Sequence, residues 1–196
     1  MVITISENKI STIEKGPYKS IGETDREIID LKGGYVLPGF WNNHSHLSDL
    51  LPDVNDILGK ENTVSATIRA GRNAMDAIKR GFTSLRSTGS RDYLDVYWGK
   101  AFKDGVFIGP TIYPAGNPIA AVGGHGIDDY GWPATIAIDG PEEMRKAVRE
   151  HVRMGVNWVK IMADELKDNE IIAAVQIAHQ NNVKVVAHAA EEGAYR

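Results

Sequence analysis

The stretch that indicates the fold most strongly reads Val36-Leu37-Pro38-Gly39-Phe40-Trp41-Asn42-Asn43-His44-Ser45-His46-Leu47. An apolar run passes through Pro-Gly and then presents two histidines one residue apart. Residues i and i+2 of a β-strand point to the same face of a sheet, so both imidazoles can reach one metal ion. Because neutral imidazole is the commonest metal ligand in proteins, the pair predicts a metal site directly after a buried strand. Alone it is a weak signal, since a polar turn after a buried strand gives the same pattern.

Extended and helical patterns alternate along the chain from Tyr35 onward. Extended runs occur at 35–41, 82–86, 111–114, 157–162 and 183–188. The segments between them carry apolar residues at helical spacing: Val64, Ile68, Ala74 and Ile78 in the first, Met144, Val148 and Val152 in the second, and Ile171, Ile172, Val175 and Ala178 in the third. Glycine follows two of these segments, at Gly81 and Gly155, which is a common way for a helix to end. Strands that alternate with helices predict a parallel sheet, either open or closed into a barrel.

The position of the polar residues decides between these two architectures. In a (β/α)₈ barrel, the residues that carry the chemistry lie at the C-terminal ends of several strands. An open doubly wound sheet would instead carry a glycine-rich phosphate-binding turn after its first strand, and none follows residue 41. We therefore expect an α/β fold, a partial TIM (β/α)₈ barrel over residues 35–196 with about five βα strands present. Residues 1–34, with extended runs at 2–6, 10–13 and 27–31, predict part of a small β-sandwich-like domain.

Four side chains at strand ends are candidate metal ligands: His44, His46, Lys160 and His188. Lys160 lies within the apolar run Trp158-Val159-Lys160-Ile161-Met162, where a charged amine is costly unless it is paired or modified. The alternative for Lys160 is a side chain that reaches solvent from an edge strand. The alternative for His188 is a hydrogen-bonded histidine of the core. Because a single metal site explains the four residues together, we favour the metal site.

Composition restricts both the kind of metal site and the kind of protein. The chain has 196 residues, of which 26 are acidic and 22 are basic, and it has no cysteine. A metal must therefore be held by nitrogen and oxygen ligands, which suit zinc, manganese, iron, cobalt or nickel. The mildly acidic balance gives no indication of a nucleic-acid partner. The N-terminus has no basic leader before an apolar core, and no stretch approaches the roughly 20 apolar residues of a membrane span, so we expect a cytoplasmic protein without a membrane partner.

The combined order of the motifs resembles the amidohydrolase superfamily, and most closely its imidazolonepropionase-like and prolidase-like branch. The resemblance covers nearly the whole chain and rests on Leu37-Pro38-Gly39-Phe40, His44-Ser45-His46, Gly81-Phe82-Thr83-Ser84-Leu85-Arg86, Gly109-Pro110-Thr111, Gly123-Gly124-His125-Gly126, Gly155-Val156-Asn157-Trp158-Val159-Lys160-Ile161 and Val186-Ala187-His188-Ala189. It implies a metal-dependent hydrolase of amide or peptide C–N bonds, acting on a small amide or dipeptide-like substrate.

The resemblance also implies roles for single residues. His44 and His46 would bind the more buried metal ion, Lys160 would react with CO₂ to form a metal-bridging carbamate, and His188 would bind the second ion. We expect one or two divalent ions, with zinc first among them, that lower the pKa of bound water towards about 7 and polarise the scissile carbonyl. His125 lies in a glycine-rich loop, where glycines permit close approach of a ligand or simply allow a tight turn. Substrate contact is our hypothesis for His125.

Several features depart from the family pattern. Asn42 and Ser87 stand where the family commonly has aspartate, and Asp164-Glu165-Leu166 follows Lys160 in place of a glycine-rich loop. The aspartate that ends strand eight of the family's barrel and the histidine of strand six have no counterpart, so we expect a fragment truncated at both ends. Two alternatives therefore stay open. One is a non-catalytic remnant or module that needs a homo-oligomer or a complementing chain to complete the barrel, and the other is an open α/β binding protein without metal.

Overall fold

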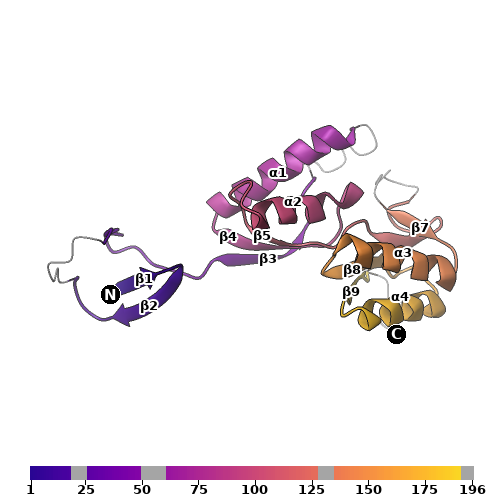
Figure 1. The fold of residues 1–196 in the computed structure, drawn as a ribbon. Coiled ribbons are helices and arrows are strands. Elements are labelled where there is room, and N and C mark those ends of the chain that lie inside the picture. The colour runs from indigo at the N-terminus through magenta and orange to yellow at the C-terminus, as the bar shows by residue number, and fades with distance from the viewer. Residues whose placement is uncertain (19–25, 50–60, 128–134, 191–196) are drawn as a thin grey trace. The chain divides into compact units, whose positions relative to one another are not determined.

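The computed structural model describes residues 1–18, 26–49, 61–127 and 135–190, and Figure 1 shows its elements. The chain divides into two compact units, Met1–Leu37 and Pro38–Arg196. Among the described residues, every helix is too short or too polar to span a lipid bilayer.

The first unit contains an antiparallel pair of strands, β1 (Val2–Ser6) and β2 (Lys9–Glu14). Glu7 and Asn8 form the turn between them, with positive φ angles of 50° and 67°. Positive φ at both central residues gives a tight hairpin turn whose twist matches that of the flanking strands. The extended runs at the start of the chain therefore form strands, as the alternation indicates.

The extended run predicted at 27–31 forms no strand in the described part of the first unit. It leads into a turn in which the Gly34 N–H donates to the Leu31 carbonyl at 2.8 Å. A strand needs a neighbour to accept and donate its backbone hydrogen bonds, and none pairs with this run among the described residues. The prediction of a strand here is wrong.

The second unit is built on two parallel sheets. β3 (Phe40–Ser45), β4 (Phe82–Ser87) and β5 (Thr111–Tyr113) form one sheet in the order β3-β4-β5. β6 (Ile119–Ala121), β7 (Ile136–Ile138), β8 (Trp158–Met162) and β9 (Lys184–His188) form the other in the order β7-β6-β8-β9. A 2.8 Å hydrogen bond from the Asn157 N–H to the Pro114 carbonyl joins the end of β5 to the start of β8. The predicted α/β class with parallel strands is confirmed, and the described strands form open sheets.

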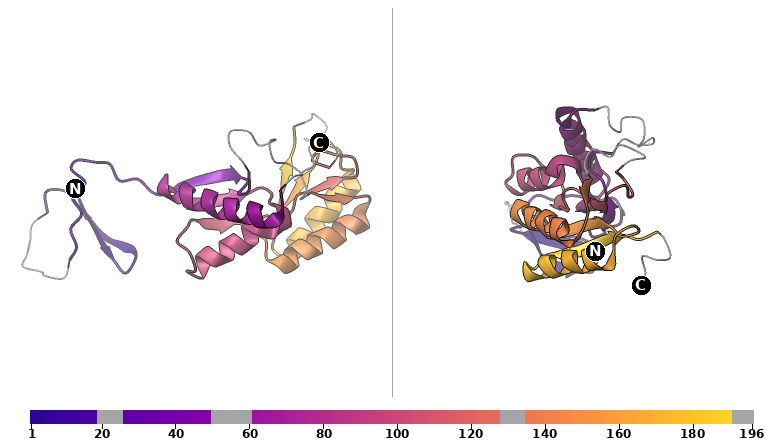
Figure 2. Two further views of the ribbon diagram at one scale, coloured as in Figure 1. Left: turned by 90° about the horizontal axis from the view of Figure 1, so that it is seen from above. Right: turned by 90° about the vertical axis from the view of Figure 1, so that its right-hand side faces the viewer.

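Helices connect the strands: α1 (Thr63–Lys79), α2 (Leu94–Lys103) after the short 3₁₀ turn η1 (Arg91–Tyr93), α3 (Pro141–Met154) and α4 (Asp168–Gln180). α1 begins where the Asn62 side chain accepts a hydrogen bond from the Ser65 N–H at 2.9 Å. α3 begins with Pro141 and ends at Gly155, which has a φ of 83°, the left-handed conformation that glycine adopts without penalty. α3 and α4 lie side by side in both views of Figure 2.

Some boundaries differ from the prediction for physical reasons. The first strand of the second unit begins at Phe40 rather than at residue 35, because Pro38 has no N–H to donate to a ladder. The strands β6 and β7 have three residues each, which is too short for a period-two pattern to be recognised. The helix α2 also lies outside the predicted set.

Each sheet packs against its own apolar core. The core of the β3–β5 sheet consists of Leu47, Ala66, Ala70, Ala74, Leu85, Leu94 and Ile112. The core of the β6–β9 sheet consists of Ile119, Ile138, Met144, Ala147, Val148, Val156, Val159, Ile161, Ala163, Leu166, Ala173, Ala174, Ile177, Ala178 and Val183. The Met144 and Val148 positions predicted for the face of α3 are therefore buried.

Helix α1 buries small residues instead of the large ones predicted for its apolar face. Val64 and Ile68 are each 68% exposed, whereas Ala70 is fully buried. A Cβ at Gly71 would lie 2.1 Å from the ring of Trp98 on α2. The two helices approach so closely that large side chains are excluded, and the apolar face predicted for α1 is wrong at Val64 and Ile68.

Candidate metal centre

Three of the predicted metal ligands lie at or near the C-terminal ends of two strands, and the fourth lies within a third strand. His44 is in β3, and His46 comes directly after its last residue. Lys160 is in the middle of β8, and His188 is the last residue of β9. Met162, two residues after Lys160, lies opposite His188 in the parallel register. Because residues two apart share a face of a sheet, the side chains of Lys160 and His188 face the same side.

The histidine pair after β3 is fixed by the backbone. The ring centroids of His44 and His46 lie 5.2 Å apart, with the planes at 65°. The Nδ1 of His46 lies 3.0 Å from the Gly89 carbonyl oxygen; a carbonyl only accepts, so Nδ1 carries the proton and Nε2 keeps its lone pair. Gly89 has a φ of 140°, and a Cβ there would lie 2.7 Å from the Pro118 ring. Glycine is therefore needed at the position that orients His46.

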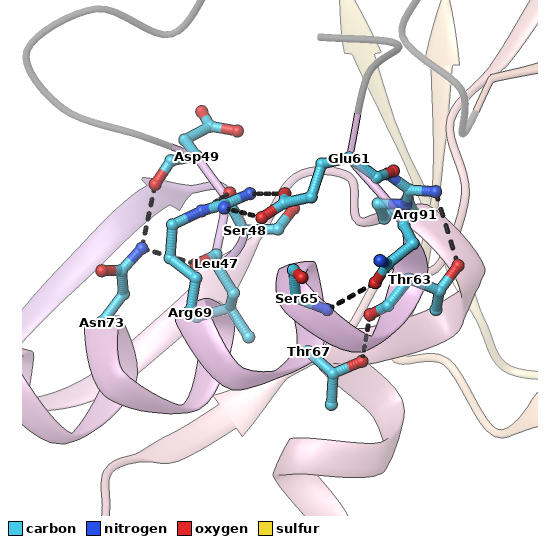
Figure 3. A network of polar contacts seen from close by, with 11 residues as sticks. Leu47, Ser48, Asp49, Glu61, Thr63, Ser65, Thr67, Arg69, Asn73 and Arg91 are labelled. Atoms are coloured by element: carbon cyan, nitrogen blue, oxygen red, sulfur yellow. Dashed lines mark hydrogen bonds and ion pairs between the residues drawn. The ribbon is translucent and has the colours of Figure 1, made fainter. Parts of the chain in front are cut away.

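Helix α1 holds the segment that directly follows His46, as Figure 3 shows. The side-chain amide of Asn73 donates to the carbonyls of Leu47 and Asp49, both at 2.9 Å. One side chain thus satisfies two carbonyls of an irregular segment, which would otherwise need water. The main chain beyond the histidine pair is therefore tied to a regular helix.

A bidentate ion pair adds to the same attachment. Arg69 of α1 donates through Nε to the Ser48 carbonyl at 2.7 Å, and its two terminal nitrogens pair with the carboxylate of Glu61. Arg91 donates to the Glu61 carbonyl at 3.1 Å. Bidentate arginine–carboxylate pairs add geometric specificity to their energy. This network orders the described backbone on either side of residues 50–60.

Lys160 is a buried amine with a cation nearby. Only 2% of its surface is exposed, and none of the described residues forms a hydrogen bond or ion pair with its ammonium group. Burial lowers the pKa of Lys160, Arg86 lowers this pKa further, and Asp164 raises it. The guanidinium carbon of Arg86 lies 4.9 Å from the centroid of the Trp158 ring. These surroundings shift the equilibrium of Lys160 toward the neutral amine relative to an exposed lysine.

The ring of His188 has two close neighbours. His125, in the loop after β6, stacks on its face with centroids 4.6 Å apart and planes at 11°. Asp164 places Oδ2 3.7 Å from His188 Nε2, and its Oδ1 accepts a hydrogen bond from the Ala190 N–H at 2.9 Å. The predicted substrate contact, His125, therefore lies against a predicted metal ligand.

Each of the three candidate histidine ligands has a pKa below its ordinary value. Burial is the largest cause for His44, His46 and His188 alike. The pKa of His44 is lowered further by His46, Lys160, Arg86 and His188, so these groups lie within electrostatic range of one another. The neutral imidazole that such surroundings favour is the form that binds a metal ion.

The histidines come together as two pairs. His44 contacts His46, and His125 contacts His188. Across residues 1–18, 26–49, 61–127 and 135–190, no group of three or more histidine, aspartate or glutamate side chains is placed to hold a metal ion. A metal centre built on these residues therefore depends on Lys160 as well as on the histidine pairs.

Three charged side chains near the centre lie outside the predicted set. Asp164 carries the strongest sequence signal of the three, since it follows the end of a strand that holds a candidate ligand. Arg86 is a charged residue within the strand β4, which is a weaker signal. Burial raises the pKa of Asp49 to about 6, against opposing effects of Arg69 and His44. Nothing in the local sequence indicates that this carboxyl is partly buried.

Known proteins resemble this chain in both sequence and structure. A family model described as amidohydrolase family matches residues 35–196. The ochratoxinase of Aspergillus niger is 30% identical over 151 residues, covering 65% of this chain and 31% of the ochratoxinase. A Xaa-Pro dipeptidase with methionine bound in its active site is 28% identical, with a TM-score of 0.85 over 98% of this chain and 52% of the dipeptidase. A prolidase in complex with N-methylphosphonate-L-proline is 29% identical, with a TM-score of 0.75 over 90% of this chain and 48% of the prolidase.

The chain therefore spans about half the length of these two solved structures and 31% of the ochratoxinase. The predicted fold, an α/β chain corresponding to part of a TIM barrel, is confirmed by these likenesses.

Proposed function

Because this chain belongs to the amidohydrolase family, we propose that it carries the metal-binding part of a hydrolase that cleaves amide or peptide C–N bonds. The observation that carries the proposal is the placement of His44, His46, Lys160 and His188 in parallel strands or directly after them. Barrel enzymes place their catalytic groups at the C-terminal ends of their strands. The likeness to a Xaa-Pro dipeptidase supports the same reaction class.

The candidate ligands offer nitrogen donors and, after modification of Lys160, oxygen donors, which suit divalent metal ions. We propose that one or two zinc ions bind here. His46 would bind through Nε2, because the Gly89 carbonyl occupies Nδ1. His44 lies beside it and would share that ion, while His188 would hold a second. The chemistry that such an ion supplies when bound is polarisation of the substrate carbonyl and acidification of a water molecule.

Lys160 fits this donor set after modification by CO₂. The neutral amine forms a bond from Nζ to the carbon of CO₂, one electron pair of a C=O bond moves to oxygen, and one proton leaves to solvent. The product is an anionic carbamate with two oxygen donors. Burial and the nearby Arg86 guanidinium favour the neutral amine that reacts, and a nearby guanidinium also stabilises the anion that results.

The proposed substrate is a small amide or a dipeptide-like molecule. His125 is exposed on the face of His188, where it can donate to a substrate carboxylate or carbonyl. Its loop contains Gly123 and Gly126 with φ angles of 73° and 84°, a conformation that lets the backbone turn tightly beside a ligand. Association with a second copy or a complementing chain, and a cytoplasmic location, stay predictions.

Metal content tests the proposal directly. The full chain is purified, incubated with zinc, passed through gel filtration and analysed by plasma emission. We expect near-stoichiometric zinc in the wild type and a loss of at least tenfold in the double variant His44→Ala, His46→Ala. The matched control is His179→Ala, which removes an exposed histidine of α4 and should leave the zinc content unchanged.

Turnover is then measured with a panel of dipeptides and N-acyl amino acids, including Xaa-Pro dipeptides. Hydrolysis that requires zinc and disappears in the double variant would support the proposed reaction. Zinc content that is the same in the wild type and the double variant would overturn the site.

A further inference from the structure

The carboxylate of Asp164 connects the ends of the two strands that hold Lys160 and His188. It lies two residues after the end of β8, and its side chain is 6% exposed. One oxygen, Oδ1, accepts from the Ala190 N–H at 2.9 Å, just beyond the end of β9. The other, Oδ2, lies 3.7 Å from His188 Nε2, at ion-pair range rather than at hydrogen-bond distance. One side chain thus fixes the backbone after β9 and faces the imidazole that ends it.

The two ring nitrogens of His188 have different surroundings. His125 covers one face of the ring at 4.6 Å, and the Asp164 carboxylate faces the Nε2 edge. An ionised carboxylate accepts hydrogen bonds and donates none. A proton on Nε2 is therefore attracted to Asp164, and the lone pair remains on Nδ1.

We infer that Asp164 is a positioning residue that holds His188 as the Nε2–H tautomer and leaves Nδ1 as the nitrogen available to a ligand. The inference rests on the proposed function only in taking that ligand to be a metal ion. In proteins, a carboxylate or carbonyl on the second nitrogen of a histidine ligand sets the ring's tautomer and orientation. His46 is arranged in the reverse sense, because its Nδ1 faces the Gly89 carbonyl, and its Nε2, which lies 3.4 Å from Thr88 Oγ1, is the nitrogen that would bind the ligand.

No other described carboxylate competes for this role. Among the residues that the structure describes, Asp164 is the only acidic residue with an oxygen within 4 Å of a His188 ring nitrogen. The exposed carboxylate of Glu165 also raises the pKa of His188, but its effect is the smallest of the causes and is smaller than that of Asp164. Asp164 and Glu165 are adjacent in sequence and carry the same charge, so they form a matched pair for testing.

The test reads the tautomer directly in the metal-free, ¹⁵N-labelled full chain. Long-range ¹H–¹⁵N correlation spectra at pH 8, where imidazole is neutral, distinguish the protonated from the unprotonated ring nitrogen. In the wild type we expect His188 to carry its proton on Nε2. In Asp164→Asn, Oδ1 can still accept from the Ala190 N–H while the amide presents a donor to the ring, so the proton should move mainly to Nδ1. Glu165→Gln should leave the tautomer unchanged.

Zinc affinity, measured by competition with a chelating dye, gives the second readout. We expect Asp164→Asn to weaken binding by about 10–100-fold, the usual effect of losing a carboxylate behind a metal ligand, and Glu165→Gln to change it less than about twofold. A wild-type His188 protonated on Nδ1, or an unchanged tautomer in Asp164→Asn, would overturn the inference, and the wild-type spectrum decides this even if the variant fails to fold. A tautomer that switches as expected in a chain that binds no zinc would support the role of Asp164 and count against the proposed function instead.

Discussion

The two sheets of the second unit hold their candidate ligands by different means. On the β3–β5 side, the Gly89 carbonyl fixes His46, and Asn73 fixes the chain that follows it. On the β6–β9 side, Lys160 is buried near Arg86, and His188 faces Asp164. Backbone carbonyls and amides do not titrate, whereas an amine, an imidazole and a carboxylate do. The backbone contacts that hold the first half's ligands therefore do not change with pH, whereas the contacts of Lys160 and His188 depend on charge.

A buried carboxylate connects these two halves. Asp95 of α2 is fully buried and accepts hydrogen bonds from the backbone N–H groups of Ala115 and Gly116 at 2.8 and 3.0 Å. The next carbonyl along, that of Asn117, lies 2.6 Å from Nε2 of His151 on α3. The segment after β5 is thus held from the first half by Asp95 and from the second half by His151. The ligands are thus held locally, whereas the halves are joined through the segment after β5 and through Trp158, whose Nε1 donates to the Ser87 carbonyl at 3.0 Å.

The largest effect is expected at this junction, where Asp95→Ala would remove one of the links between the halves. The substitution leaves two buried N–H groups without an acceptor, so we expect the free energy of unfolding to fall by about 4 kcal/mol. Urea unfolding followed by circular dichroism measures this. Asp104→Ala, which removes an exposed carboxylate paired with Lys100, is the control and should cost less than about 0.5 kcal/mol.

Hydrogen exchange would show whether both halves respond to Asp95→Ala. We expect amide protection to fall in β4 and β5 and also in β8, because the segment after β5 bonds to the start of β8. Protection that falls only in the first half would show that the halves unfold independently, as two separate folding units.

An effect of opposite sign is expected at Lys160. Lys160→Met replaces a buried amine with an apolar side chain of similar length, and we expect the unmodified chain to gain about 2 kcal/mol of stability at pH 7. Because the pKa of Lys160 is lowered on folding, the unfolded chain binds this proton more tightly, and wild-type stability should rise with pH up to about 10. The advantage of the variant should therefore shrink as the pH increases.

Urea titrations at pH 7 and pH 10 in CO₂-free buffer measure this difference. Lys184→Met, at an exposed position of β9, is the matched control and should change stability by less than about 0.5 kcal/mol. A Lys160→Met chain that is less stable than the wild type at pH 7 would mean that the amine has a stabilising partner, and the contrast between the two halves would weaken.

The length and composition of a strand decide whether it can be predicted from the sequence. Two of the strands that carry candidate ligands, β8 and β9, are predictable because each is a largely apolar run bounded by polar residues. The expected run at 157–162 is observed as Trp158–Met162, and the run at 183–188 as Lys184–His188. The strands β6 and β7 cannot be predicted from the sequence, because three residues are too few to show a period-two pattern.

Contacts between elements that lie far apart in the chain cannot be predicted from a local sequence pattern. Arg86 and Trp158 meet only because β4 and β8 come together in the folded chain. Asp164 reaches His188 because the parallel register of β8 and β9 places their ends side by side. The nature of the candidate ligands is thus readable from sequence, whereas the groups that orient them depend on register and packing. The metal-binding roles of His44, His46, Lys160 and His188, and substrate contact by His125, stay predictions.

The smallest effect is expected at Asp49, a partly buried carboxylate of the first half whose stability contribution changes with pH. Burial raises its pKa to about 6, so the folded chain binds this proton more tightly than the unfolded chain does. Asp49 should therefore reduce stability progressively as the pH rises from about 4 to about 6, and by a constant amount above that. A shift of this size corresponds to at most about 3 kcal/mol, and partial exposure to solvent reduces the expected effect to about 1 kcal/mol. Asp49→Asn keeps the backbone carbonyl that accepts from Asn73, so the stability difference between this variant and the chelator-treated wild type should grow over this pH range and then level off. A difference that does not change between pH 4 and pH 7 would show that Asp49 is solvated like an ordinary surface carboxyl, and the first half would then be as insensitive to pH as its backbone contacts imply.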